Sequence, residues 1–282
     1  MSFLSVVMCF KNESHILEEW INHYIDEGVD QFVLCDNNST DDYESILNKF
    51  DNIVLFKDDS PSIQLECKSP MSKYGSNIYS KMISDTESEW YIIVDADEFM
   101  YSRGQYKTIR DFLKQRGSEF NQLLVPTPQF HNKWPNEIQE QPESVIDTFT
   151  ESCHNFITKS IVKKEYLIKC YLHEHRVKGR STRSHLKDDF NLGDKFDWKY
   201  KDVWRTYPDE EVFVRCNHYR FQSKEFFLKV KKERGWADGP GYGGNDRPTG
   251  KRNRLNQWHS ANALDYNSDY ELKNKKKMYK RK

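Results

Sequence analysis

The stretch that most constrains the fold is Trp90-Tyr-Ile-Ile-Val-Asp-Ala-Asp-Glu-Phe-Met100. Its first half, from Trp90 to Val94, is an unbroken apolar run of aromatic and β-branched residues, which predicts a central strand covered on both faces. The run stops at Asp95, and charged side chains are costly inside a sheet. We therefore expect the carboxyl end of this strand to emerge at the edge of the sheet where open α/β proteins bind ligands.

Two carboxylates follow this predicted strand one residue apart. Asp95 and Asp97, separated by the small Ala96, can both turn toward one divalent cation whose remaining positions are filled by water and phosphate oxygens. An Asp-X-Asp sequence also occurs in ordinary solvated loops. Its place directly after a buried strand favours a metal site.

A strand pattern and a helix pattern open the chain. The apolar run at 4–10 predicts a strand, and apolar residues at helical spacing predict a helix at 16–25. Asn12 or Ser14 is expected to cap the start of this helix, and Gly28 to close its end. No Gly-x-Gly-x-x-Gly sequence follows the first strand, which argues against a dinucleotide-binding fold of the usual kind.

The later elements continue this alternation. They are strands at 31–35, 53–56, 123–126, 160–162, 166–172 and 212–216, and helices at 43–50, 74–83, 108–116 and after Ser223. The order predicts an α/β fold whose first three strands form a parallel, right-handed half-sheet. We expect residues 1–235 to form this domain, and residues 236–282 to form a glycine-rich loop, a C-terminal helix and a basic tail.

Composition narrows the classes of function. Charged residues are 31% of the 282 residues but sum to a net charge of -1, so no global field attracts nucleic acid. No apolar run approaches the length of a membrane span, and no signal-peptide pattern precedes the first strand, so we expect a cytoplasmic protein. The six cysteines form no Cys-x-x-Cys pair, which favours reduced, buried thiols.

Several short motifs together resemble one group of enzymes. In chain order they are Phe10-Lys-Asn-Glu13, Glu19-Trp20 with His23-Tyr24, Asp36-Asn-Asn-Ser-Thr-Asp41 and Val94-Asp-Ala-Asp-Glu-Phe99. They are similar to the family 2-like glycosyltransferases of GT-A fold, a Rossmann-like mixed sheet flanked by helices. The later run Asn217-His-Tyr-Arg-Phe-Gln-Ser-Lys-Glu-Phe-Phe227 resembles a motif of the related glycosyltransferase family 92.

This resemblance implies a metal-dependent enzyme of glycan or surface polysaccharide synthesis. It would move a sugar from a nucleotide diphosphate sugar, with a UDP-sugar as the expected donor, to a glycan or lipid-linked acceptor with inversion. Mn²⁺ or Mg²⁺ would neutralise the charge of the departing diphosphate. The residues expected to bind the metal ion are Asp95, Asp97 and His218, and those expected around the nucleotide are Phe10, Lys11, Glu13, Asp36, Asn37, Asp95 and Ala96.

Two of these assignments have plain structural alternatives. Asp36 and Asn37 can simply cap the next helix. His218 is expected directly after the strand at 212–216, where it faces the crevice and binds the ion. It can instead hydrogen-bond across the strand end and organise the helix that follows.

The acceptor hydroxyl also needs a general base. The acidic pair that family 2-like enzymes usually carry after the metal motif is missing from this chain. Glu174, which lies between two histidines, and Asp189, next to Asp188, are the candidates. Each can also be an ordinary surface carboxylate.

Two other classes of protein compete with this assignment. A metal-dependent nucleotidyl or phosphoryl transferase would also use Asp95 and Asp97, but such enzymes often carry a glycine-rich basic loop near the N-terminus, where this chain has only Lys11. A structural zinc or carbohydrate-binding site would use histidines, although no pair has the spacing of a known zinc module. The histidines considered are His173, His175, His185 and His218.

The C-terminal run is strongly basic. Residues 271–282 carry seven basic side chains and one acidic one, a pattern usually found in solvated tails. Such a run can also attract an anionic membrane surface, which would hold the enzyme near a lipid-linked acceptor. The chain is then expected to be cytoplasmic and peripheral at the inner face of a membrane.

Overall fold

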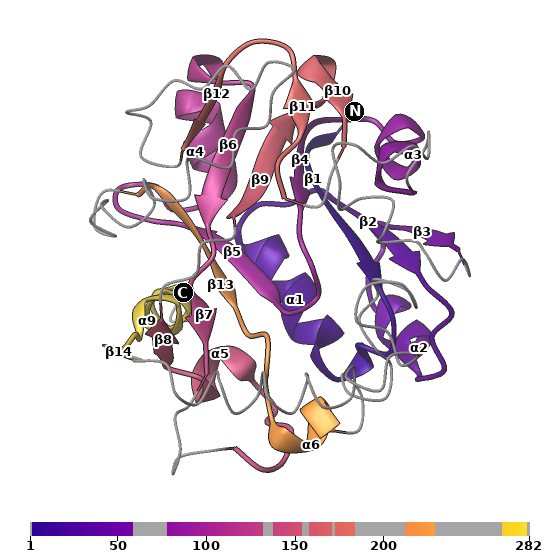
Figure 1. Ribbon diagram of the computed structural model, residues 1–282, viewed down its shortest axis with the longest axis vertical. Coiled ribbons are helices and arrows are strands. Elements are labelled where there is room, and N and C mark those ends of the chain that lie inside the picture. The colour runs from indigo at the N-terminus through magenta and orange to yellow at the C-terminus, as the bar shows by residue number, and fades with distance from the viewer. Residues whose placement is uncertain are drawn as a thin grey trace, which may run out of the picture.

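The computed structural model describes residues 2–58, 78–131, 138–153, 158–170, 173–183, 212–228 and 267–280. Within these ranges the fold consists of a seven-stranded mixed sheet, a five-stranded sheet beside it and a two-stranded ribbon, with helices around them (Figure 1). The predicted α/β class, a mixed sheet flanked by helices, is confirmed.

The large sheet has a parallel half and a mixed half. In spatial order its strands are β12 (Ser181–Arg183), β6 (Gln122–Pro126), β9 (Thr158–Lys163), β4 (Ser88–Ile93), β1 (Ser2–Phe10), β2 (Gln31–Asp36) and β3 (Ile53–Lys57). Strands β1, β2 and β3 run parallel, as the alternating sequence predicted, and β4 is parallel to β1 as well. Strand β9 is antiparallel to both of its neighbours, β4 and β6.

The remaining strands flank this sheet. The five-stranded sheet contains, in order, β14 (Asn267–Ser268), β8 (Glu151–Cys153), β7 (Gln129–Phe130), β13 (Val214–His218) and β5 (Glu98–Ser102). The ribbon pairs β10 (Leu167–Lys169) with β11 (Arg176–Val177). Strands β5 and β13 run antiparallel, side by side, through the middle of the molecule (Figure 1).

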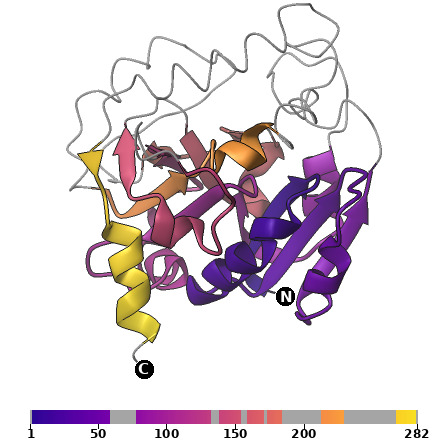
Figure 2. The same cartoon turned by 90° about the horizontal axis from the view of Figure 1, so that it is seen from below.

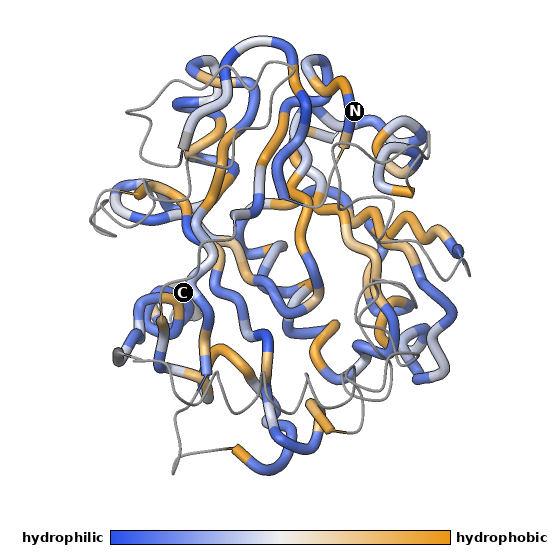
Figure 3. The backbone as a smooth tube through the Cα atoms, in the orientation of Figure 1, coloured by the Kyte–Doolittle hydropathy of each residue, from blue (hydrophilic) through white to orange (hydrophobic). Residues whose placement is uncertain are grey.

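Helices cover both faces of the large sheet. The covering helices are α1 (Ser14–Asp26), α2 (Tyr43–Leu47), α3 (Ile78–Ser84) and α4 (Ile109–Arg116), whereas α5 (Val145–Thr148), α6 (Lys224–Phe226) and α9 (Glu271–Lys280) lie on the side of the five-stranded sheet (Figure 1). Alternate residues of β1 pack on opposite sides: Met8 lies in the core cluster beneath α1, α2 and α4, and Val7 in the cluster beneath α3. Figure 3 shows the apolar residues concentrated along the strands of this sheet.

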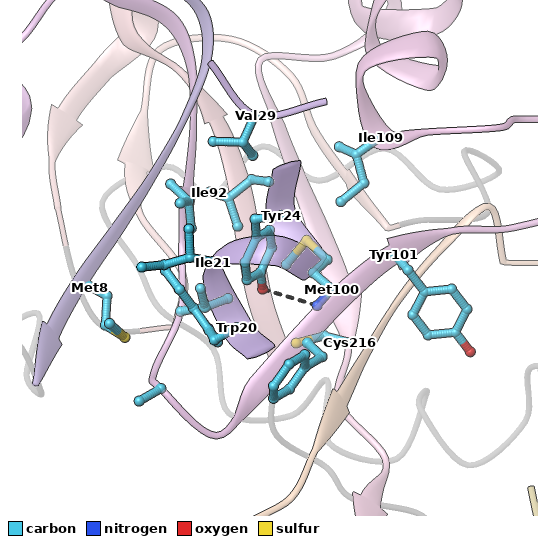
Figure 4. Packing of buried hydrophobic residues seen from close by; sticks show 14 of the residues in the cluster. Met8, Trp20, Ile21, Tyr24, Val29, Ile92, Met100, Tyr101, Ile109 and Cys216 are labelled. Carbon is cyan, nitrogen blue, oxygen red and sulfur yellow. Dashed lines mark hydrogen bonds between the residues drawn. The ribbon is translucent and has the colours of Figure 1, made fainter. Parts of the chain in front are cut away.

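Helix α1 fixes the start of β5. The Tyr24 hydroxyl accepts from the amide of Met100 at 3.0 Å (Figure 4) and donates to the carbonyl of Glu98, also at 3.0 Å. The Trp20 indole N–H donates to the same Glu98 carbonyl at 3.1 Å. Since Tyr24 and Trp20 are fully buried, these bonds hold the strand that follows Asp97 in one position.

The prediction for the N-cap of α1 was wrong. Neither Asn12 nor Ser14 caps the helix: the N-cap residue is Glu13, which makes no capping bond with its side chain. The Ser14 amide donates instead to Asp41 Oδ2 at 2.7 Å, so the cap comes from the loop after β2. The expected end of the helix is confirmed, because Gly28 follows it with a φ of +85°.

Two predicted boundaries also change near the expected site. Strand β13 extends through His218, so this histidine lies inside the strand and not after it. The central strand ends at Ile93, and Glu98 opens β5, an element that the sequence did not predict. Residues 94–97 therefore form the turn that joins the two main sheets.

Residues 271–280 of the basic C-terminal run form helix α9, which docks on the domain beside β8 and β14 (Figure 1 and Figure 2). Leu272 is buried in the main core, and the Lys275 ammonium bonds Glu27 and the Ser102 carbonyl. The glycine-rich segment lies outside the described residues, so the division at residue 235 stays a prediction. None of the described helices has the length and apolar character of a membrane span.

Candidate active site

The turn between β4 and β5 brings the acidic motif against β13. The Glu98 amide donates to the Asp95 carbonyl at 3.1 Å, which closes the turn. The register between β5 and β13 sets His218 opposite Glu98, and the Tyr219 amide donates to the Asp97 carbonyl at 2.7 Å. Residues more than a hundred positions apart are thus joined by backbone bonds.

This arrangement brings Asp97 and His218 together. The His218 Nε2 atom lies 3.5 Å from Asp97 Oδ1, and the two side chains are 13% and 10% exposed. The other ring nitrogen, Nδ1, lies 3.9 Å from Glu98 Oε1. A carboxylate oxygen and an imidazole nitrogen that adjoin each other at a strand end are a donor pair suited to Mn²⁺.

Asp95 has a different partner, which the sequence did not predict. The Lys159 ammonium, from β9, lies 2.8 Å from Asp95 Oδ2 and 2.9 Å from Glu98 Oε2. Glu98 Oε2 also accepts from the Asp95 amide at 2.8 Å. The Lys159 side chain is completely buried, so the acidic motif contains a built-in cation.

The charges of this cluster shift one another's pKa values. Burial acts to raise the pKa of Asp95, but the Lys159 ammonium outweighs it, and the pKa lies below its ordinary value. For Glu98 burial dominates over the same ammonium, so its pKa is raised. Burial acts to lower the pKa of Lys159, but Asp95 and Glu98 outweigh it and the pKa lies above its ordinary value. Lys159 therefore stays a cation, and Asp95 stays ionised beside it.

The three residues expected to bind the metal ion, Asp95, Asp97 and His218, form only part of a binding site for a divalent cation. Asp95 Oδ1 and His218 Nδ1 are buried without a hydrogen-bond partner among the described residues. Yet nowhere in the described ranges do three or more histidine, cysteine, aspartate or glutamate side chains come together as a ready metal site. Asp97 and His218 fit as two ligands of an ion that takes its other ligands from water or substrate oxygens. Asp95 is already committed to Lys159.

The residues expected around the nucleotide form a second group. Loops 10–13 and 36–41 bond each other directly: the Asn37 amide donates to the Phe10 carbonyl at 2.8 Å, and the Asn12 amide to Ser39 Oγ at 3.0 Å. Lys11 is half-buried and Glu13 is buried in the first loop. Their contact with a nucleotide stays a prediction.

Asp36 and Asn37 hold these loops together. Asp36 accepts from the Ser39 amide at 2.8 Å and from the Tyr43 hydroxyl at 3.0 Å, and Asn37 donates to the Asp58 carbonyl at 2.7 Å. The N-cap of α2 is Asp42, so neither residue caps that helix. These hydrogen bonds are structural, and a role in binding the base or ribose would come in addition.

Of the two candidate bases, only Glu174 lies in the described residues. Its Oε1 atom is 3.5 Å from the Thr158 hydroxyl, and Thr158 directly precedes Lys159. Asp189, with Asp188, falls outside the described ranges. Glu174 therefore contacts the first residue of β9, the strand that also carries Lys159.

The histidines do not form a zinc site in the described residues. His175 is buried against Ser160, with Nε2 at 2.8 Å from its hydroxyl, and His173 Nδ1 lies 3.0 Å from the Thr158 carbonyl. His218 belongs to the cluster around Asp97, and His185 lies outside the described ranges. The five cysteines that the structure describes are buried, and none of them forms a disulfide within the described residues.

The family model of glycosyltransferase family 92 matches residues 83–237, which is more than half of the chain and includes the whole acidic cluster. The chain belongs to glycosyltransferase family 92. The match confirms the resemblance to this family, and it extends well beyond the 217–227 motif on which that resemblance rested. The likeness to family 2-like enzymes stays a prediction.

One curated relative is another family 92 protein, from Ricinus communis. It is 22% identical over 256 residues, which cover 88% of this chain and 42% of the relative. The chain thus spans less than half of the length of that family 92 protein.

Two solved glycosyltransferase-type structures show a partial likeness. S. aureus TarS in complex with UDP has a TM-score of 0.38 and 14% identity, over 57% of this chain and 47% of TarS. Glucosyl-3-phosphoglycerate synthase of Mycobacterium tuberculosis, in complex with Mn²⁺ and UDP, has a TM-score of 0.32 and 13% identity, over 59% of this chain and 58% of the synthase. At these scores, the ligands of those proteins do not carry over to this chain.

Proposed function

We propose that this family 92 chain transfers a sugar from a nucleotide diphosphate sugar to a hydroxyl group of a glycan or lipid-linked acceptor. Family membership supports glycosyl transfer. The observation that carries the proposal is the placement of Asp97 and His218 side by side, 3.5 Å apart, at the turn after the central strand. Such strand ends are where open α/β sheets bind ligands.

A divalent cation, Mn²⁺ or Mg²⁺, is part of this proposal. Asp97 Oδ1 and His218 Nε2 would hold it, and when bound it would neutralise the charge that develops on the departing diphosphate. His218 is anchored for this role, because it lies inside β13 and its ladder with β5 fixes its backbone. A UDP-sugar is the donor that we expect, with its nucleotide beside loops 10–13 and 36–41.

The reaction in this site is a single displacement. The acceptor oxygen forms a bond to the anomeric carbon, the bond to the diphosphate oxygen breaks, and the configuration inverts. The hydroxyl proton goes to a general base. Glu174 is the candidate for this base among the described residues, because its carboxylate lies 3.5 Å from the hydroxyl of Thr158, the residue before Lys159.

A screen of donors tests the proposal. Purified protein is incubated with UDP- and GDP-sugars in the presence of Mn²⁺, and release of the nucleoside diphosphate is measured with and without a chelator. We expect release from at least one sugar, abolished by the chelator. The competing nucleotidyltransferase function predicts instead that a sugar phosphate and a nucleoside triphosphate are consumed and pyrophosphate is released. That outcome would contradict glycosyl transfer.

A location at the inner face of a membrane belongs to the same proposal, supported by the basic character of α9. Lys273 and Lys275 of this helix bond to the domain, whereas Lys277 and Met278 are exposed. An exposed lysine beside an exposed methionine suits a membrane surface. Sedimentation with anionic vesicles at low salt, compared with a Lys277→Glu variant, tests this location.

A further inference from the structure

Lys159 lies at the centre of the acidic cluster and takes no part in the proposed chemistry. Its ammonium joins two carboxylates that follow β4, although Lys159 itself comes from β9. Its side chain is fully buried, and its ammonium is paired with both carboxylates. Any effect on the reaction must pass through the residues that it holds.

The two carboxylates depend on Lys159 to different degrees. Glu98 is fully buried, bonds the Asp95 amide at 2.8 Å and also faces His218. The Asp95 side chain is 29% exposed, and within the described residues Lys159 is the group that bonds its carboxylate: Oδ2 accepts from the ammonium, and Oδ1 is buried and has no hydrogen-bond partner. Loss of Lys159 would leave Glu98 anchored and the Asp95 carboxylate free to rotate.

A buried ammonium is costly unless it is well paired, and a purely structural ion pair is a common reason for one. The structural explanation requires only that Lys159 neutralise the buried Glu98. This explanation does not require the contact between Lys159 and Asp95. Asp95 is the first carboxylate of the Asp-X-Asp motif, and its Oδ1 atom has no hydrogen-bond partner among the described residues. The contact with Asp95 is the feature that points to function.

We propose that Lys159 is a positioning residue that acts through Asp95. Its ammonium holds Oδ2, so that the partly exposed Asp95 carboxylate is fixed in orientation to accept a hydrogen bond from the donor nucleotide, while Asp97 binds the cation. This inference rests on the proposed function, since it needs a donor bound at the acidic motif.

The test separates positioning from charge balance. Lys159→Met alone leaves two carboxylates without their cation and is expected to unfold. Lys159→Met combined with Glu98→Gln removes one charge of each sign and keeps the formal charge of the cluster unchanged. Glu98→Gln alone retains the Lys159–Asp95 pair and is the reference. Lys163→Met is the matched control, because Lys163 lies on the same side of β9 but is partly exposed and pairs with Glu165.

Melting temperature and the affinity for UDP and for GDP, each with Mn²⁺ present, are measured for all variants by calorimetry. We expect the double variant and Glu98→Gln to melt at similar temperatures. The double variant should bind the preferred nucleotide about tenfold or more weakly than Glu98→Gln, as expected for the loss of one oriented hydrogen bond to a charged group. Lys163→Met should bind like the wild type.

Each other outcome contradicts the inference. Equal affinities in the double variant and in Glu98→Gln would show that Asp95 does not need its ammonium. A double variant that unfolds while Glu98→Gln folds would assign Lys159 to the fold instead. A wild-type protein that binds neither nucleotide would overturn the proposed function, and the positioning role with it.

Discussion

Asp97 is the residue whose loss should separate activity from stability most cleanly. Asp97→Asn keeps the size of the side chain but removes the charge that a divalent cation requires. Because metal stabilisation of a leaving group is worth several kcal/mol, we expect sugar transfer to fall at least about a hundredfold. The melting temperature should change little. Asp85→Asn, at an exposed pair with Lys81, is the control.

The measurement is the initial rate of nucleoside diphosphate release at saturating Mn²⁺, together with thermal unfolding of both variants. An Asp97→Asn protein with wild-type turnover would exclude Asp97 from the metal site. The corresponding change at Asp95 is less clean, because it would also leave Lys159 with a single partner.

His218 offers a second test at the same scale. If it binds the ion, His218→Ala should weaken Mn²⁺ binding in the presence of UDP by about tenfold or more and leave the stability of the metal-free protein nearly unchanged. If it only hydrogen-bonds across the strand, stability should fall by about 1 kcal/mol while Mn²⁺ affinity stays the same. Calorimetric titration of Mn²⁺ and chemical denaturation distinguish these results.

At the scale of elements, helix α9 is bonded to the rest of the domain through ion pairs. The Lys275 ammonium reaches the buried Glu27 carboxylate, and Glu271 pairs with Arg103 of the segment after β5 and with Arg215 of β13. Both strands that carry the site, β5 and β13, are therefore tied to the last helix. The prediction that these basic residues form a solvated tail was wrong for Lys275, since only 14% of its side chain is exposed.

Lys275→Met should destabilise the protein by about 3 kcal/mol, because it leaves the buried Glu27 charge without its partner. Adding Glu27→Gln should restore much of that loss by removing the unpaired charge. Lys277→Met, on the exposed side of the same helix, should have no effect. Urea unfolding of the three variants measures these differences. A Lys275→Met protein as stable as the wild type would show that α9 does not anchor the domain.

The sequence predicted strands and helices best where the apolar residues of a single element show the spacing of that element. The apolar run at 90–94 and the helical spacing at 16–25 located β4 and α1 to within two residues, because burial acts directly on those side chains. The cap at Asp41 could not be predicted in this way, since it depends on the approach of two loops. Short strands such as β5 and β7 depend on pairing with distant partners, which leaves little local signal.

The same distinction applies to the site. Asp97 and His218 were predicted because each ends or follows a recognisable apolar run, and the structure brings them together. Lys159 was missed because it directly precedes the predicted strand at 160–162 and looks like a boundary residue. Only the antiparallel pairing of β9 with β4 shows that this lysine points into the core beside Asp95.

At the scale of the whole molecule, buried histidines should make stability depend on pH. Burial, with Lys159 and His173 nearby, lowers the pKa of His175 to about 3, and burial with Lys276 nearby lowers the pKa of His23. These side chains stay neutral in the folded protein but take up a proton on unfolding below a pH of about 6.5. The unfolded state then binds more protons, so stability falls as the pH is lowered.

Each such histidine should remove about 2 kcal/mol of stability between pH 7 and pH 5. His175→Gln should therefore flatten the pH dependence of the free energy of unfolding by this amount, whatever its effect at pH 7. Chemical denaturation of the wild type and the variant at pH 7, 6 and 5 gives both slopes. Parallel slopes would mean that His175 is protonated in the folded protein.

The ladder between β5 and β13 makes the site sensitive to a change that alters no side chain. Along a strand, neighbouring residues face opposite sides, so one residue inserted within β13 ahead of His218 would turn its imidazole away from Asp97. The side chain of Asn217 would take its place. A substitution in one of these strands changes one side chain and leaves the register intact, whereas a shift of one position moves every side chain of β13 relative to β5 and separates His218 from Asp97. Insertions should therefore be rejected within these two strands, and also in the turn at 94–97 that carries Asp95 and Asp97.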